Sequence, residues 1–108
     1  MTRSIVALAL ALLTLLGCST LEGYRHFQAG TGALDRGDAA DAVAELERAA
    51  AILPEQSEVF NHLGLAYAAA GRQSDALLAF ERAVALDCDN HVAKANLRAA
   101  QASALGAR

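Results

Sequence analysis

Apolar residues recur at helical spacing through most of the chain, in blocks separated by short polar or glycine-containing turns. The spacing predicts five helices, over residues 23–36, 39–53, 57–70, 74–87 and 91–105. In the fourth block Ala76, Phe80 and Ala83 follow one another at i, i+4 and i+7, which places them on one helix face. No valine and isoleucine run of strand length interrupts this pattern. The sequence therefore predicts an all-α fold.

The second half of this pattern repeats the first at a fixed offset, the distance in sequence from Gly30 to Gly64. The same offset aligns Gly71 with Gly37, Ala76 with Ala42, Phe80 with Leu46, and Ala83 with Ala49. A fixed offset that keeps glycine, small and large apolar residues in one order is typical of stacked helix–turn–helix units. We therefore expect antiparallel helix pairs that stack as an α-solenoid.

The repeated glycine has a packing reason. Without a side chain, Gly64 lets two helices approach closely, although glycine inside a helix costs about 1 kcal/mol relative to alanine. Phe80 and Tyr67 are predicted to fill the space above and below this crossing, and Gly71 fits a left-handed helix end. The residues expected to pack the repeats together are Gly30, Gly64, Tyr67, Ala76, Phe80 and Ala83.

The unit at residues 57–90 resembles the tetratricopeptide repeat family. The resemblance depends on an aromatic residue, a Leu-Gly pair, a tyrosine, a turn glycine and an Ala-Phe-Ala series, at Phe60, Leu63, Gly64, Tyr67, Gly71, Ala76, Phe80 and Ala83. Cys88 departs from it, because the family usually has proline there. The resemblance implies a domain over residues 23–105, with a degenerate repeat at 23–56, a second repeat at 57–90 and a capping helix at 91–105.

Residues 1–17 differ from the rest of the chain. Arg3 precedes Ile5–Leu16, an uncharged apolar run that is shorter than the ~20 residues a membrane-spanning helix needs. A positive residue followed by a short apolar run is typical of a secretory signal peptide, so we expect an N-terminal signal helix before the solenoid. Two alternatives to a signal that is processed at Cys18 are an ordinary signal peptide, in which this cysteine is incidental, and a buried N-terminal helix.

The run ends in Leu15-Leu16-Gly17-Cys18, which resembles the lipobox of bacterial lipoproteins. The resemblance implies removal of residues 1–17, acylation of Cys18 (palmitate among the expected modifications) and a short tether over residues 18–22. It also implies membrane attachment through Cys18. Since Ser19 is not aspartate, it implies delivery to the outer membrane, facing the periplasm.

Charge and motifs narrow the candidate chemistry. The formal net charge is −3, from which we expect no nucleic-acid partner. The sequence has no zinc-protease, nucleophile-elbow or phosphate-loop motif, so we expect neither an enzyme nor a cofactor or metal. Asp87, Cys88, Asp89 and His91 resemble a ligand cluster, but a polar turn between helices explains them. With Cys18 acylated, Cys88 would have no cysteine partner within the chain, and it could join two molecules by a disulfide.

The tetratricopeptide resemblance implies a concave groove lined by the first helices of each unit, where a protein or peptide partner binds. The residues placed there are Tyr24, Phe27, Thr31, Leu34, Glu58, Asn61, Leu65, Ala68 and Val92. Most are apolar or uncharged, and Asn61 offers a polar contact. The alternative is that Tyr24, Phe27 and Leu34 only cover the exposed edge of the first unit.

These interpretations together predict a lipid-anchored adaptor that binds its partner at the periplasmic face of a bacterial membrane. Similar architectures occur in short repeat lipoproteins that assist assembly of pilus or secretion complexes. The alternatives are a self-associating scaffold, which would form a homo-oligomer, and an accessory subunit of a larger envelope complex.

Overall fold

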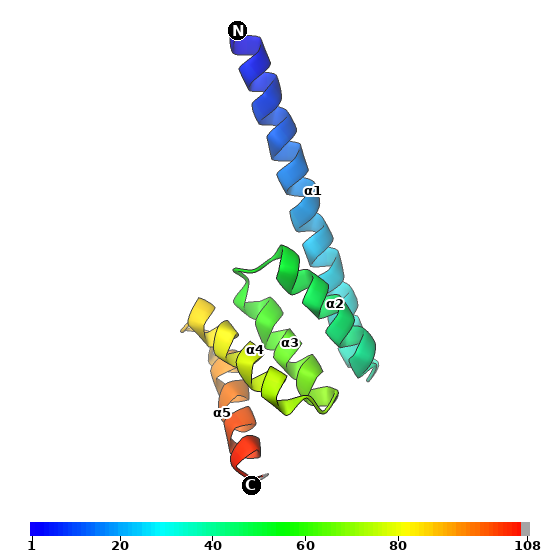
Figure 1. The fold of residues 1–108 in the computed structure, drawn as a ribbon, viewed down its shortest axis with the longest axis vertical. Helices are drawn as coiled ribbons and strands as arrows, with labels where there is room; N and C mark the ends of the chain where they lie inside the picture. Colours follow the sequence, from blue (N-terminus) through cyan, green and yellow to red (C-terminus); the bar gives the residue numbers. More distant parts are fainter. Residues whose placement is uncertain (107–108) are drawn as a thin grey trace.

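Five helices make up the fold of the computed structural model, which describes residues 1–106 (Figure 1). They are α1 (Thr2–Asp35), α2 (Ala39–Ile52), α3 (Ser57–Ala69), α4 (Gln73–Leu86) and α5 (His91–Gly106). The described residues contain no strand, so the all-α prediction is confirmed. The last four helices lie within one or two residues of their predicted bounds.

Helix α1 is longer than predicted. It starts at Thr2 instead of residue 23 and runs without a break through the predicted tether at 18–22. No proline interrupts this stretch, and the hydroxyls of Thr14 and Thr20 donate to the carbonyls of Ala11 and Gly17, three residues earlier, without leaving the helix. The first half of α1 therefore projects from the other helices (Figure 1). With this projecting half included, the structure extends 66 Å along its longest axis.

This projecting half of α1 has an uncovered apolar surface. Ile5, Leu8, Leu13 and Leu15 are 65–71% exposed. Among residues 1–106, α1 is the one helix long and apolar enough to cross a membrane. None of its most apolar stretch is buried in the structure. A helix close to the N-terminus also passes this test when it is a signal sequence, so the finding by itself assigns no membrane span.

The second half of α1 pairs with α2, and α3 pairs with α4, in two antiparallel hairpins that share one crossing geometry. At Gly30 an added Cβ would lie 2.5 Å from Cγ of Leu46 on α2. At Gly64 it would lie 2.5 Å from a ring carbon of Phe80 on α4. Leu46 and Phe80 are almost completely buried, so each fills the gap that its glycine leaves.

The two hairpins end their first helices in the same way. Gly37 and Gly71 both have φ of +76°, the left-handed conformation that glycine adopts without strain. After α3 the N–H of Arg72 donates to the carbonyl of Tyr67 and that of Gly71 donates to Ala68, which satisfies the helix end. The chain then reverses into α4. The two hairpins pack together through α2 and α3, and the core lies between them.

Gly64→Ala tests the close crossing. Alanine improves helix propensity by about 1 kcal/mol, but the methyl group would overlap the Phe80 ring, and overpacking costs about 1–3 kcal/mol. We expect a net loss of about 1 kcal/mol in the free energy of unfolding, measured by urea denaturation followed by circular dichroism. Gly32→Ala is the control: its Cβ would meet only the flexible Arg36 side chain at 3.4 Å, so that variant should be stabilised. Equal effects at the two glycines would contradict the packing argument.

Candidate functional site

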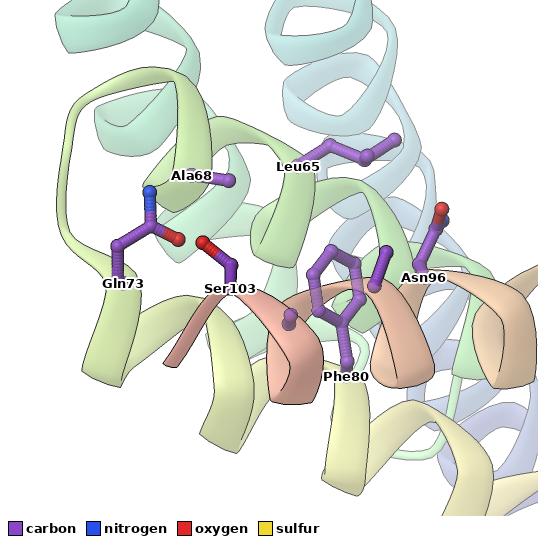
Figure 2. Close-up of a pocket in the computed structure, with 8 residues that line it drawn as sticks. Leu65, Ala68, Gln73, Phe80, Asn96 and Ser103 are labelled. Atoms are coloured by element: carbon purple, nitrogen blue, oxygen red, sulfur yellow. The ribbon is translucent and has the colours of Figure 1, made fainter. Parts of the chain in front are cut away.

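An apolar pocket opens where α3, α4 and α5 meet. It has a volume of ≈ 200 Å³, and Figure 2 shows Leu65 and Ala68 of α3, Phe80 of α4, and Asn96 and Ser103 of α5 around it. Gln73, Ala99 and Ala100 complete the lining, and none of the eight residues is charged. The volume is below the roughly 300–1,000 Å³ typical of small-molecule sites. The pocket therefore suits one or two apolar side chains of a larger partner.

Helix α5 packs on α4 beside this pocket, and side-chain hydrogen bonds join it to α3. In α5 only Ala93 is fully buried among the described residues. The Asn96 side-chain amide donates to Oδ1 of Asn61 on α3 at 2.9 Å, and Asn61 is 2% exposed. At the start of α5, the Asn90 amide donates to the Ser57 hydroxyl at 3.0 Å. Two side-chain hydrogen bonds therefore fix α5 and the turn before it to α3, next to the pocket.

The structure places the nine residues predicted for the groove in different surroundings. Of the nine, only Leu65 and Ala68 line the pocket. Phe27 and Leu34 pack against the core, and the Phe27 ring meets the His62 ring edge-on at 5.1 Å between centroids. The carboxamide oxygen of Asn61 already accepts a hydrogen bond from Asn96. The remaining four are Tyr24 and Val92, both exposed, Thr31, which donates to the carbonyl of Gln28, and Glu58, which lies beside His62.

Sequence reasoning missed most of the α4 and α5 contributions to the pocket. Phe80 was predicted only as packing for Gly64, yet it also lines the pocket. Asn96 was not predicted at all, although it lies one repeat length after His62 and so occupies a first-helix repeat position. The repeat register could have identified Asn96, but its partner Asn61 could not be predicted without knowing how far α5 lies from α3.

A charged cluster joins α1 to α2 away from the pocket. Nδ1 of His26 lies 2.6 Å from Oε2 of Glu45, and Arg48 donates to the other Glu45 oxygen at 2.9 Å. The hydrogen bond from His26 holds the pKa of the Glu45 carboxyl below its usual value; partial burial opposes this, and the charge of Arg48 supports it. Ionised Glu45 therefore stabilises the first hairpin.

The three histidines do not converge. His62 Nδ1 donates to the backbone carbonyl of Glu58 at 2.9 Å on α3, whereas His26 lies on α1 and His91 begins α5. No group of three or more histidine, cysteine or acidic residues that could hold a metal occurs within residues 1–106. Cys88 has a free and exposed thiol in the turn before α5.

A family comparison extends over all the hairpins and the pocket. The model of the family described as "Bacterial transcriptional activator domain" matches residues 20–105. The chain belongs to the bacterial transcriptional activator domain family. The match includes α2 to α5 and the packed half of α1, and it leaves out residues 1–19. Among curated proteins, none matches this chain.

This family assignment shows that the tetratricopeptide resemblance is wrong as an identification. The residues behind it are real packing positions: Gly30 and Gly64 lie at close helix crossings, and Ala76 and Ala83 are buried. Tyr67 packs against the core, and its hydroxyl donates to Glu47. Any tightly crossing helix hairpin needs small and large apolar residues at such spacing. The pattern therefore reports how helices pack, and it does not separate one family of helical hairpins from another.

The lipoprotein identification is also wrong, and with it the acylation of Cys18 and attachment to a membrane. It depended on Arg3, the apolar run at 5–16 and the sequence from Leu15 to Cys18, all of which lie inside one continuous helix. The exclusion of nucleic acid is overturned as well, because a transcriptional activator family acts where DNA is present. Net charge bears on direct phosphate binding by this chain and not on the process it serves. The envelope location, the domain bounds and the lack of enzymatic activity stay predictions.

Acidification tests the Glu45 cluster. Because the folded-state pKa of Glu45 is lowered, its stabilising contribution is present above the unfolded-state pKa and is lost as the pH falls through the folded-state pKa. Between about pH 5 and about pH 3, Glu45→Gln should therefore lose less free energy of unfolding than the wild type. Thermal melts at each pH measure this. Glu55→Gln, at an exposed position, should behave as the wild type does.

Asn96→Ala tests the attachment of α5. The substitution leaves the buried Asn61 oxygen without its donor, which costs about 1–3 kcal/mol. We expect faster amide hydrogen exchange in α5 with little change in α2, because α5 has few buried apolar residues to compensate. Ser103→Ala, also on the pocket lining, removes no hydrogen bond found in the structure and serves as control. Unchanged exchange in α5 would show that the amide pair does not hold the helix.

Proposed function

We propose that this domain recruits a protein partner in bacterial transcription by binding apolar side chains of that partner in the pocket between α3, α4 and α5. Membership of the transcriptional activator domain family supports the process. The pocket supports the mode of binding, since it is open, apolar, uncharged and too small for most metabolites. The proposed function is therefore that of an adaptor. It retains the protein or peptide partner that the sequence predicted, but not the membrane anchor.

The packing of the pocket fits such a role. Leu65 is 37% exposed at its edge, whereas Phe80, 3% exposed, forms part of its wall and is fixed by the Gly64 crossing. An accessible apolar residue at the edge and a fixed ring within are suited to an anchoring side chain from an amphipathic helix. Asn96, Gln73 and Ser103 supply uncharged hydrogen-bonding groups around the same opening.

We also propose that the two hairpins and α5 form a short solenoid. The order α1 to α5 is a sequence of neighbours: α2 packs on α3 and α4 packs on α5, with α3 also touching α5. In a solenoid each unit contacts its neighbours, and such stacks present extended binding surfaces. This arrangement supports the placement of the pocket between the last complete hairpin and α5.

Self-association is a second candidate, favoured by the uncovered leucines of α1. Exposed apolar patches of this kind mark interaction surfaces in soluble proteins. Light scattering of the full chain separates the candidates, since self-association raises the particle mass above the 11.2 kDa of one chain.

A reporter assay tests the recruitment function. The full chain is fused to an unrelated DNA-binding domain in a bacterium that carries the matching operator upstream of a reporter gene. We expect the fusion to raise reporter output. Leu65→Glu should abolish most of the gain, because partner binding would have to remove water from a carboxylate at the pocket edge, which is unfavourable. Leu78→Glu, at an exposed α4 position outside the pocket, should keep it. No gain with the wild type, or equal output from both variants, would refute the proposal.

A further inference from the structure

Helix α5 carries a polar stripe on the side opposite the pocket. His91, Lys94, Arg98, Gln101 and Leu105 follow one another at intervals of three and four residues and so share one face. The pocket residues Asn96, Ala99 and Ser103 lie about half a turn away around the same helix. We call the face made by Lys94, Arg98 and Gln101 the basic stripe.

The two cations of the basic stripe have no acidic partner. Within residues 1–106 neither Lys94 nor Arg98 takes part in a hydrogen bond or ion pair through its side chain. Three arginines elsewhere do form ion pairs: Arg36 with Asp41 at 3.6 Å, Arg48 with Glu45 at 2.9 Å and Arg72 with Asp75 at 2.9 Å. Although the net charge of the chain is −3, these two uncompensated cations give one face of α5 a local positive charge.

The internal repeat shows what normally lies over this face. Lys94 lies one repeat length after Phe60 and two repeat lengths after His26. His26 contacts the covering helix α2 through Glu45, with 2.6 Å between Nδ1 and Oε2. Phe60 contacts the covering helix α4 through Arg82, whose guanidinium carbon lies 5.8 Å from the ring centroid. Position 94 therefore belongs to the surface that a second helix covers in both complete hairpins.

Arg98 also lies on the surface that a second helix covers in the complete hairpins, but it is a large residue where they have glycine. It occupies the register of Gly30 and Gly64, the two glycines on which Leu46 and Phe80 pack. A long cationic side chain there keeps a covering helix from approaching as closely as α2 and α4 do. The face therefore favours a partner that pairs with the guanidinium and does not need a glycine gap.

We propose that the basic stripe of α5 docks an acidic amphipathic helix of a protein partner, which covers α5 as α2 covers α1. One carboxylate of that helix pairs with Lys94, as Glu45 pairs with His26, and the next residue is a carboxylate that pairs with Arg98 in place of Leu46. The complementarity of charge identifies the partner: two unpaired cations, one helical turn apart, match two acids on a facing helix.

A phosphate backbone fits the stripe less well. Two cations neutralise about two phosphates, which gives weak and strongly salt-dependent binding, and the net negative charge of the chain opposes association with DNA. Leu105, which follows the basic stripe on the same face and is 70% exposed, also suits an apolar residue of a facing helix. DNA is therefore the competing outcome of the test.

A synthetic peptide with the sequence of residues 38–53 and the change Leu46→Glu is the probe, because residues 38–53 include the helix that covers α1. It is added to isotope-labelled full chain at low salt, and backbone chemical shifts are followed by NMR. We expect shifts along the basic stripe. In the chain, combined Lys94→Glu and Arg98→Glu should weaken binding about tenfold, since exposed pairs contribute up to about 1 kcal/mol each.

Control variants separate docking on the basic stripe from binding elsewhere on the chain. Arg25→Glu removes an exposed α1 cation and should leave peptide binding unchanged, as should Leu65→Glu in the pocket. A peptide with Glu45→Gln and Leu46→Gln should bind about tenfold more weakly than the probe. No shifts at millimolar probe, or shifts confined to other helices, would overturn the proposal. So would tighter binding of a random-sequence DNA duplex that both α5 substitutions abolish.

Discussion

Each complete hairpin of this domain depends on a steric fit between one glycine and one large side chain. Gly30 receives Leu46, and Gly64 receives the Phe80 ring, at separations that leave no space for even a methyl group. The close approach buries the small residues Ala33, Ala66, Ala76 and Ala83 completely. Alanine contributes little apolar area, so a fold this rich in it gains stability only when its helices lie close together.

Helix α5 shows what happens where this fit is missing. Arg98 stands in the glycine register, no helix among the described residues covers it, and α5 relies on the Asn61–Asn96 and Ser57–Asn90 hydrogen bonds. The consequence is a helix with two accessible faces: one borders the apolar pocket and the other carries the unpaired cations. The uncovered face that carries the cations therefore arises from this departure from the repeat.

The family assignment and the residue pattern report different properties. Spacing of Gly64, Tyr67 and Phe80 describes how two helices cross, and several helical families solve that problem in the same way. The match over residues 20–105 uses the whole domain and identifies the bacterial transcriptional activator domain. The lipoprotein interpretation depended on residues 3–18, a short segment that the family match leaves out.

The sequence by itself determined the bounds of α2 to α5 and the repeat relation between the two hairpins, but not the length of α1. Periodicity marked α2 to α5 within two residues, and the fixed repeat offset related Gly30 to Gly64 before any contact was known. Local spacing suffices for this because helix faces and turns depend on near neighbours. Only the tertiary structure decided which side chains meet across helices: that Asn61 is buried against Asn96, that Leu65 borders a pocket walled by Phe80, and that Lys94 faces no acid. These outcomes depend on the distance and rotation between helices, which no single helix encodes.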